Sequence, residues 1–195
     1  MKITLEVKPF AELEVDALAT YVFEDDEPVQ GRLAEIDKLT GGLLGRLSKS
    51  GELTGKPLEI TLLHAPTGLK SARLMLIGAG NREQFNPAMQ RKVAGVALRN
   101  LKSRNVHKVA FLVWENDATE QLAQALTEGA LTADFEADKY KTDKKKDKFV
   151  DEFVIVGYGN AEKAAVEKGL NRGRIIGEAQ NFARDLVEMK IDRRL

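Results

Sequence analysis

The side chains of this sequence that most readily bind metals or transfer protons are its two histidines, His64 and His107. Each is expected at the end of a strand, and neither has a second histidine or a carboxylate at metal-ligand spacing. The chain has no cysteine and none of the His-Glu-x-x-His, Gly-x-Ser-x-Gly or P-loop motifs. The sequence therefore predicts no catalytic residue and no metal ligand in this chain. A catalytic pair of carboxylates stays open, because any two of the 30 acidic residues could meet in space.

Two glycine-containing turns resemble the start of a phosphate-binding loop. The segment 78–80 (Gly-Ala-Gly) follows a predicted strand, but a full dinucleotide fingerprint needs a third glycine where this chain has Glu83. The next helix starts only near Pro87, so its first amides are too far from the turn to bind a phosphate. A plain strand-to-helix turn is favoured here, and the same interpretation holds for residues 157–160.

A lysine-rich run at residues 139–148 is the one segment whose local charge departs strongly from zero. It holds six lysines and two aspartates. A solvated loop is the favoured prediction. The alternative is weak contact with the backbone of a nucleic acid, because clustered lysines release counterions from phosphates. The lysines that would make this contact are Lys141, Lys144, Lys145, Lys146 and Lys148.

Length and composition fit one domain of 195 residues with a real core. Hydrophobic residues make up 43% of the chain, and 30 basic residues balance 30 acidic ones. The formal net charge of +0 excludes a global attraction to DNA or to an anionic membrane. We expect a cytoplasmic protein without membrane contact, because the sequence shows neither a signal peptide nor an apolar run long enough to span a bilayer.

Alternating and continuous apolar segments predict six strands, with helical patterns between them. The strands are expected at residues 2–8, 16–23, 57–64, 72–78, 107–114 and 152–157. Several are nearly continuous in apolar residues, which is typical of strands covered on both faces. In the second part of the chain, strands and helices alternate. This order predicts an α/β fold with a mixed, mostly parallel sheet and helices on both faces.

The helical segments carry recognisable start signals. A helix is expected from Val29 on, and a pair of glycines interrupts it before a short second piece. Asn86 before Pro87 predicts the N-terminus of a third helix, since Asn caps helices well and Pro fits their first position. Asp117 is expected to cap the fourth helix.

A long helical region from about Ala161 to Val187 closes the predicted fold. Its apolar residues recur at i, i+4, i+7 and i+11, which is the spacing of one helix face. We expect this face to pack on the sheet, and the end of the helix beyond Arg184 to project outward. The face consists of Ile175, Ala179, Phe182 and Leu186.

Two stretches of the sequence carry a resemblance to a known family. The first, from Glu128-Gly129 to Tyr140-Lys141, resembles the "EG…F…YK" stretch in the N-terminal domain of the cytosol leucyl aminopeptidase family. The second, residues 181–187 (Asn-Phe-Ala-Arg-Asp-Leu-Val), resembles the helix that links this N-terminal domain to the catalytic one. The other segments, from about residue 10 on, are similar to the family in order and spacing.

The resemblance implies a macro-like domain at residues 1–187 and a divergent polar tail at 188–195. In the family this domain is joined to a C-terminal exopeptidase domain that holds two divalent metals, usually zinc or manganese, and the enzymes assemble as hexamers. The family's metal ligands and catalytic arginine lie in motifs that resemble GKG-x-TFD-x-GG and NTDAEGR. Neither motif occurs here, so no catalytic residue and no cofactor is carried over to this chain. A fragment, a truncated gene and a stand-alone relative stay open as alternatives.

Two functional hypotheses from different classes follow. The first is a non-catalytic accessory domain of a leucyl aminopeptidase-type metallo-exopeptidase, with a role in assembly or substrate access and with the catalytic domain or further copies as partners. The second is a module that binds ADP-ribose or a related nucleotide, as macro domains outside this family often do, or that binds nucleic acid weakly. The acidic segment 24–26 stands where macro domains carry an Asn-Ala-Ala-Asn-like run, and it would oppose a diphosphate.

Overall fold

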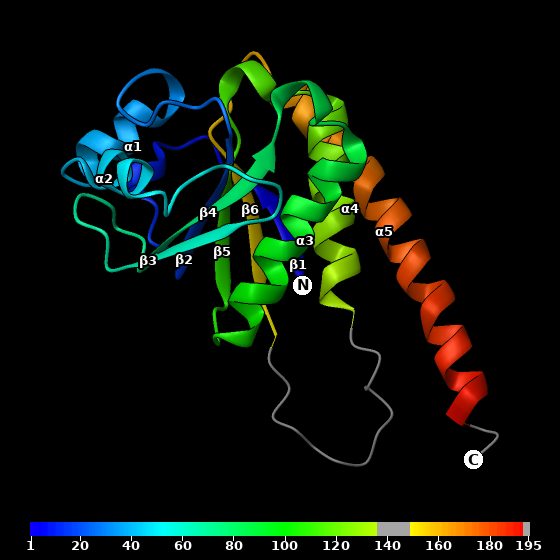
Figure 1. Cartoon of the computed structure of the whole chain (residues 1–195). Helices are drawn as coiled ribbons and strands as arrows, with labels where there is room; N and C mark the ends of the chain where they lie inside the picture. The colour runs from blue at the N-terminus through cyan, green and yellow to red at the C-terminus, as the bar shows by residue number, and fades with distance from the viewer. Residues whose placement is uncertain (136–148, 193–195) are drawn as a thin grey trace.

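The computed structural model of the chain describes residues 1–135 and 149–192 (Figure 1). The described residues are built on a single six-stranded sheet. The lysine-rich run at 139–148 lies outside the described residues, so the prediction of a solvated loop stays a prediction. None of the helices in the described ranges is both long and apolar enough to cross a membrane.

All six predicted strands form. They are β1 (Lys2–Leu5), β2 (Ala17–Phe23), β3 (Ile60–His64), β4 (Arg73–Gly80), β5 (Lys108–Leu112) and β6 (Glu152–Val156). Their order across the sheet is β1-β6-β5-β2-β4-β3, and each neighbouring pair is parallel except the antiparallel pair of β3 and β4. The predicted mixed, mostly parallel sheet is confirmed.

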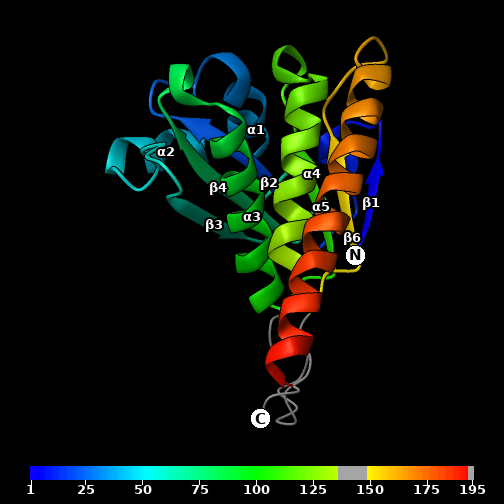
Figure 2. The same ribbon diagram turned by 90° about the vertical axis from the view of Figure 1, so that its right-hand side faces the viewer.

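Helices cover both faces of the sheet, as predicted (Figure 1, Figure 2). One face carries α3 (Pro87–Ser103), α4 (Glu120–Asp134) and α5 (Lys163–Asp192), and the other carries α1 (Ala34–Leu39) and α2 (Leu43–Ser50). Because side chains alternate along a strand, β2 feeds two separate apolar cores. Tyr21 and Phe23 belong to the core under α3 and α4, whereas Val22 belongs to the core under α1.

The predicted start of α3 is confirmed, but the predicted cap of α4 is wrong. Asn86 Oδ1 accepts the backbone N–H groups of Ala88 and Met89 at 3.0 and 3.1 Å. At α4 the cap is Thr119, whose Oγ1 accepts the backbone N–H of Leu122 at 3.1 Å. Asp117 lies in a 3-10 turn before the cap, and other side chains of the fold bind its carboxylate instead.

The prediction for the apolar face of the last helix is also wrong. Ile175 and Phe182 are 69% and 64% exposed, so the stripe of large apolar residues points away from the protein. The face that packs is made of small residues at every fourth position, Gly169, Gly173 and Gly177, and it lies against α4.

Glycine is required on this face because the two helix backbones approach closely. An added Cβ at Gly173 would lie 2.6 Å from the carbonyl oxygen of Gln124, and one at Gly177 would lie 2.9 Å from Cβ of Leu131. A large side chain has no room there. The helix therefore turns its glycines inward and its large side chains outward, and it extends to Asp192, past the predicted end at Val187.

Candidate functional site

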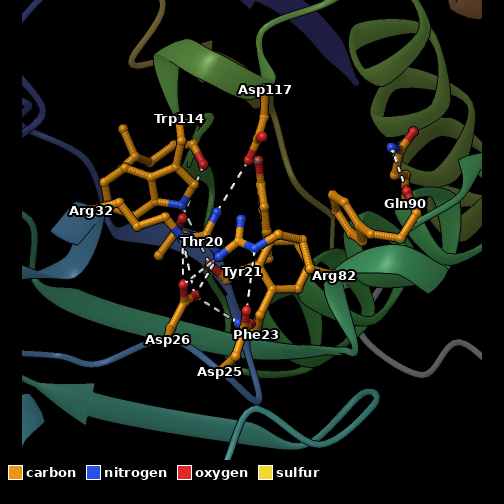
Figure 3. A network of polar contacts seen from close by, with 12 residues as sticks. Thr20, Tyr21, Phe23, Asp25, Asp26, Arg32, Arg82, Gln90, Trp114 and Asp117 are labelled. Carbon is orange, nitrogen blue, oxygen red and sulfur yellow. Dashed lines mark hydrogen bonds and ion pairs between the residues drawn. The ribbon is translucent and has the colours of Figure 1, made fainter.

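The carboxyl ends of β2 and β5 form the place where this topology would accept a ligand. After β2 the chain continues to β3 and β4 on one side of the sheet, and after β5 it continues to β6 on the other side, so the strand order reverses between β2 and β5. Open α/β sheets bind ligands at such a switch point, in the crevice outside the carboxyl ends of the strands. In this protein a cluster of its own side chains lies there, as Figure 3 shows from close by.

The guanidinium of Arg32 is the centre of this strand-end cluster. Its central carbon lies 4.4 Å from the ring centroid of Phe23, 4.9 Å from that of Tyr21 and 5.3 Å from that of Trp114. Phe23 ends β2, and Trp114 follows β5, so the cation joins two strands. The side chain of Arg32 is only 14% exposed, which strengthens the attraction between the charge and the rings.

Two carboxylates neutralise Arg32. Nη2 donates to Asp26 Oδ2 at 2.6 Å, and Nη1 donates to Asp117 Oδ2 at 3.2 Å. Asp26 is 6% exposed and also accepts the backbone N–H of Phe23 at 2.8 Å. The half-exposed Arg82 donates to Asp26 Oδ1 at 2.8 Å. The hydrogen-bonding capacity of Asp26 is therefore used within the protein.

The hydroxyl of Tyr21 completes the cluster by donating to Asp117 Oδ2 at 2.7 Å. Burial raises the pKa of Tyr21 well above its ordinary value, and the charge of Asp117 raises this pKa further. The phenol therefore stays protonated near neutral pH and acts as a hydrogen-bond donor, not as a general base. The arrangement supports a structural role, in which the cluster ties the acidic loop after β2 to the ends of two strands.

An open pocket of about 420 Å³ borders the cluster, at the carboxyl ends of β5 and β6. Trp114 belongs to both the pocket and the cluster. The walls include the apolar side chains of Phe10 and Leu112, and the charged side chains that line it are Lys8 and Glu35. Residues 157–159, part of the second glycine-containing turn, also line it. Its volume is in the range of small-molecule sites.

The two histidines lie at strand ends, as expected from the sequence. His64 is the exposed last residue of β3, and His107 precedes β5 with its Nδ1 3.1 Å from a carboxylate oxygen of Asp151. Within residues 1–135 and 149–192, no three metal-ligating side chains (His, Cys, Asp or Glu) come close enough together to hold a metal ion.

The first glycine-containing turn has a packing role. A Cβ on Gly78 would overlap the carbonyl oxygen of Lys56, and Gly80 adopts a φ of +74° with the ring of Pro57 close by. The segment before β3 therefore crosses β4 at these glycines. This accounts for them without a phosphate. The candidate nucleic-acid lysines, Lys141, Lys144, Lys145, Lys146 and Lys148, lie outside the described residues.

The strand-end cluster was missed by the sequence reasoning. Asp117 lies 85 residues from Arg32 in the sequence, and the three residues Asp26, Arg32 and Asp117 match no motif. The one local signal is an acidic turn followed closely by an arginine, directly after a strand that ends in aromatic residues.

Comparison with solved structures defines the class of fold. A Trypanosoma brucei macrodomain, solved in complex with ADP, is similar with a TM-score of 0.64 and 16% identity, over 86% of this chain and 68% of that one. A tomato leucine aminopeptidase mutant is similar with a TM-score of 0.67 and 19% identity, over 87% of this chain and 35% of that one. The chain is thus an α/β domain with a macro-like fold, as the sequence predicted.

Sequence comparison then identifies the family. Residues 20–144 match the model for the cytosol aminopeptidase family, N-terminal domain. A probable cytosol aminopeptidase of Solibacter usitatus is 40% identical over 187 residues, and one of Acidobacterium capsulatum is 32% identical over 200 residues; each comparison covers 96% of this chain. The chain belongs to the cytosol aminopeptidase family and corresponds to its N-terminal domain. It spans 36% and 39% of the length of these two relatives.

Proposed function

We propose that this chain is a non-catalytic accessory domain of a metallo-aminopeptidase, with a role in assembly or in substrate access. The observation that carries the proposal is that the chain matches an N-terminal domain and spans only 36% of its Solibacter usitatus relative. In this proposal the peptidase site, with two divalent zinc or manganese ions, belongs to the part of such proteins that this chain does not cover. The relatives' name, cytosol aminopeptidase, supports a cytoplasmic location.

The chemistry of the strand-end cluster supports this division of labour. Arg32 binds both Asp26 and Asp117, and Tyr21 donates to Asp117 with a raised pKa. A general base is a proton acceptor whose pKa lies near the working pH, and a nucleophile needs such a base beside it. The groups of this cluster instead satisfy one another. They stabilise the strand ends. In this proposal, hydrolysis takes place in the part of such proteins that this chain does not cover.

The test is an assay of the purified chain with a leucyl anilide and added zinc or manganese. We expect no release of leucine. Turnover that co-purifies with the chain, falls in an Asp117→Asn variant and is unchanged in a Glu24→Gln control would overturn the proposal. The control alters an acidic residue of the loop after β2 whose side chain does not bind Arg32.

A second candidate function is the binding of an ADP-ribose-like nucleotide, and one observation favours it. The open pocket beside Trp114 has a suitable volume and lies at the carboxyl ends of parallel strands, on a fold similar to that of a macrodomain solved with ADP. The charges weigh against it, because Glu35 lines the pocket and Lys8 already pairs with Glu6 at 3.3 Å. We therefore rank it second.

Calorimetry with ADP-ribose and with ADP separates the two candidates. We expect no binding in the micromolar range. Micromolar binding that is lost in a Trp114→Ala variant but kept in a Trp114→Phe variant would reverse the ranking, because it would place the ligand on the aromatic wall of the pocket.

A further inference from the structure

The open pocket beside Trp114 has walls that match a small ligand with both an apolar part and charges. Apolar side chains from two segments line it, and one of them, Val7, is 42% exposed, so part of this wall is in contact with solvent. The volume of about 420 Å³ lies toward the lower end of the range of roughly 300–1,000 Å³ for small-molecule sites. The pocket therefore fits a compact ligand. The apolar side chains are those of Val7, Pro9, Phe10, Leu112, Val113 and Trp114.

One basic and one acidic side chain accompany these apolar walls. Lys8 lies in the segment after β1, and Glu35 lies in the first turn of α1. Lys8 pairs with Glu6, but with exposures of 61% and 32% this ion pair is weak and can give way to a ligand. Within the part of the chain that the structure describes, the carboxylate of Glu35 has no hydrogen bond and no ion pair. The two charges oppose a diphosphate, but they suit a ligand that carries one charge of each sign.

Backbone donors add to the basic side of the pocket. Gly157, Tyr158 and Gly159 line it directly after β6. Among the described residues, no hydrogen bond engages the backbone N–H groups of these three residues. Such donors bind most strongly to an ionised acceptor, because a hydrogen bond to a charged group is roughly twice as strong as one between neutral groups. The pocket therefore offers a lysine and free amides to a carboxylate, and a glutamate to an ammonium group.

We propose that this pocket binds a free α-amino acid with an apolar side chain. The ammonium group of this zwitterion pairs with Glu35, and its carboxylate binds Lys8 and the amides of residues 157–159. The side chain packs on the wall that contains Trp114 and Phe10. The inference rests on the proposed function for the source of the ligand, since an aminopeptidase releases free amino acids. In this way the domain senses the product of the activity that the proposed function assigns to the rest of such proteins.

A fluorescence titration of the intact chain tests the proposal, because Trp114 is the only tryptophan of the sequence. At constant pH and ionic strength, we expect L-leucine to give a saturable change with a dissociation constant of about 1 mM or lower. Three relatives of leucine should each bind about tenfold or more weakly. N-acetyl-leucine lacks the ammonium group, leucinamide lacks the carboxylate, and glycine lacks the apolar side chain. Equal responses to all four compounds, or no saturation well above the millimolar range, would overturn the proposal.

A pair of variants tests the position of the ligand. Glu35→Gln removes the partner of the ammonium group and should raise the dissociation constant of L-leucine about fivefold or more. The matched control is Glu27→Gln, because Glu27 is exposed in the loop after β2 and does not line the pocket. An unchanged affinity in the Glu35→Gln variant would overturn the assignment of the site. The anilide assay reports on the proposed function separately, since release of leucine by the chain would overturn that function and would leave the affinities measured here as they are.

Discussion

The side-chain amide of Asn181 donates a hydrogen bond of 2.8 Å to the carbonyl oxygen of Leu131. One turn further along α5, Arg184 Nη1 donates to the carbonyl oxygen of Thr132 at 3.2 Å, and its guanidinium lies 5.5 Å from the ring of Phe135. The last carbonyls of a helix have no partner within it, so α5 caps the end of α4. The two stretches that carry the family resemblance in the sequence thus meet in space at this contact.

Replacement of Asn181 by alanine should destabilise the chain by about 1–2 kcal/mol, because the carbonyl of Leu131 loses its donor. Asn171 lies exposed on the same helix, so Asn171→Ala reports the gain in helix propensity alone. The measurement is the free energy of unfolding in urea. Equal effects of the two replacements would show that the bond contributes nothing.

Alanine at Gly173 should destabilise the chain although alanine favours helices. The new Cβ would lie 2.6 Å from a carbonyl oxygen of α4, so one helix must shift, at about 1–3 kcal/mol. Gly45 in α2 is the matched control, because its nearest neighbour is 3.6 Å away and it does not adopt a positive φ. Gly45→Ala should stabilise the chain by up to about 1 kcal/mol. Thermal or urea unfolding should therefore show opposite signs, and a shared sign would contradict the close approach of α4 and α5.

Loss of the cation at Arg32 should be among the most destabilising single changes on this side of the sheet. Arg32→Met leaves Asp26 buried with one cation fewer, and we expect a loss of about 2–4 kcal/mol. Arg82→Met removes the other arginine from the same carboxylate, but Arg82 is 47% exposed and its loss should stay below about 1 kcal/mol. Urea unfolding of both variants compares them directly. A larger effect at Arg82 would contradict the central role of Arg32.

The hydroxyl of Tyr158 should make stability depend on alkaline pH. Burial raises the pKa of Tyr158 from 10.0 to about 12, and the charges of Glu167 and Glu6 add to the rise. Between these two values the unfolded chain releases the proton and the folded chain keeps it. The contribution is therefore complete below the unfolded pKa and lost as the pH rises to the folded one, at a cost of about 2–3 kcal/mol.

Tyr158→Phe isolates this effect, since the other tyrosines titrate in both chains. As the pH rises from the unfolded to the folded pKa of Tyr158, the parent should lose unfolding free energy relative to the variant. A difference that stays constant over this pH range would refute the assignment. Near neutral pH the variant should be as stable as the parent or slightly more stable, because the buried hydroxyl has no hydrogen-bond partner among the described residues.

Binding of duplex DNA by the lysine-rich run should be weaker than millimolar at physiological salt. Six lysines and two aspartates give a local charge of six minus two, or plus four. If all four excess charges met phosphates, the slope of the logarithm of the binding constant against the logarithm of the salt concentration would be roughly −3.6. The comparison is a salt titration with a chain in which five lysines become serine. Submillimolar binding that this variant loses would establish the alternative. The five are Lys141, Lys144, Lys145, Lys146 and Lys148.

The strands and their mostly parallel arrangement could be predicted, because they follow from local apolar patterns and from the alternation of strands and helices. β2 and β5 are buried on both faces and read as nearly continuous apolar runs. The predicted ends of the strands are less accurate where contacts of the backbone decide them. The strand expected from residue 57 begins at Ile60, because Leu58 donates its N–H to Gly78 across the sheet at 2.7 Å and precedes the regular pairing.

The orientation of α5 and the strand-end cluster could not be predicted for different physical reasons. A hydrophobic pattern ranks large side chains above glycine, but close packing of two helix backbones reverses that ranking at Gly173. The cluster depends on contacts between residues as distant as Arg32 and Asp117, which no local pattern reports. The residues next to Asp117 in the sequence predict a helix cap, but they carry no information about Arg32 and Tyr21, which bind its carboxylate in the fold.

The strand-end cluster also limits how this fold can change during evolution. Arg32 lies at the strand ends where related topologies accept a ligand, and Asp26 and Asp117 bind its guanidinium. Removal of Arg32 alone leaves the buried Asp26 with one cation fewer, and removal of both carboxylates alone leaves the guanidinium of Arg32 buried without its acidic partners. A lineage would therefore lose this cluster with least cost by replacing all three residues together. Each single replacement gives a destabilised intermediate, so the cluster at these strand ends resists gradual change.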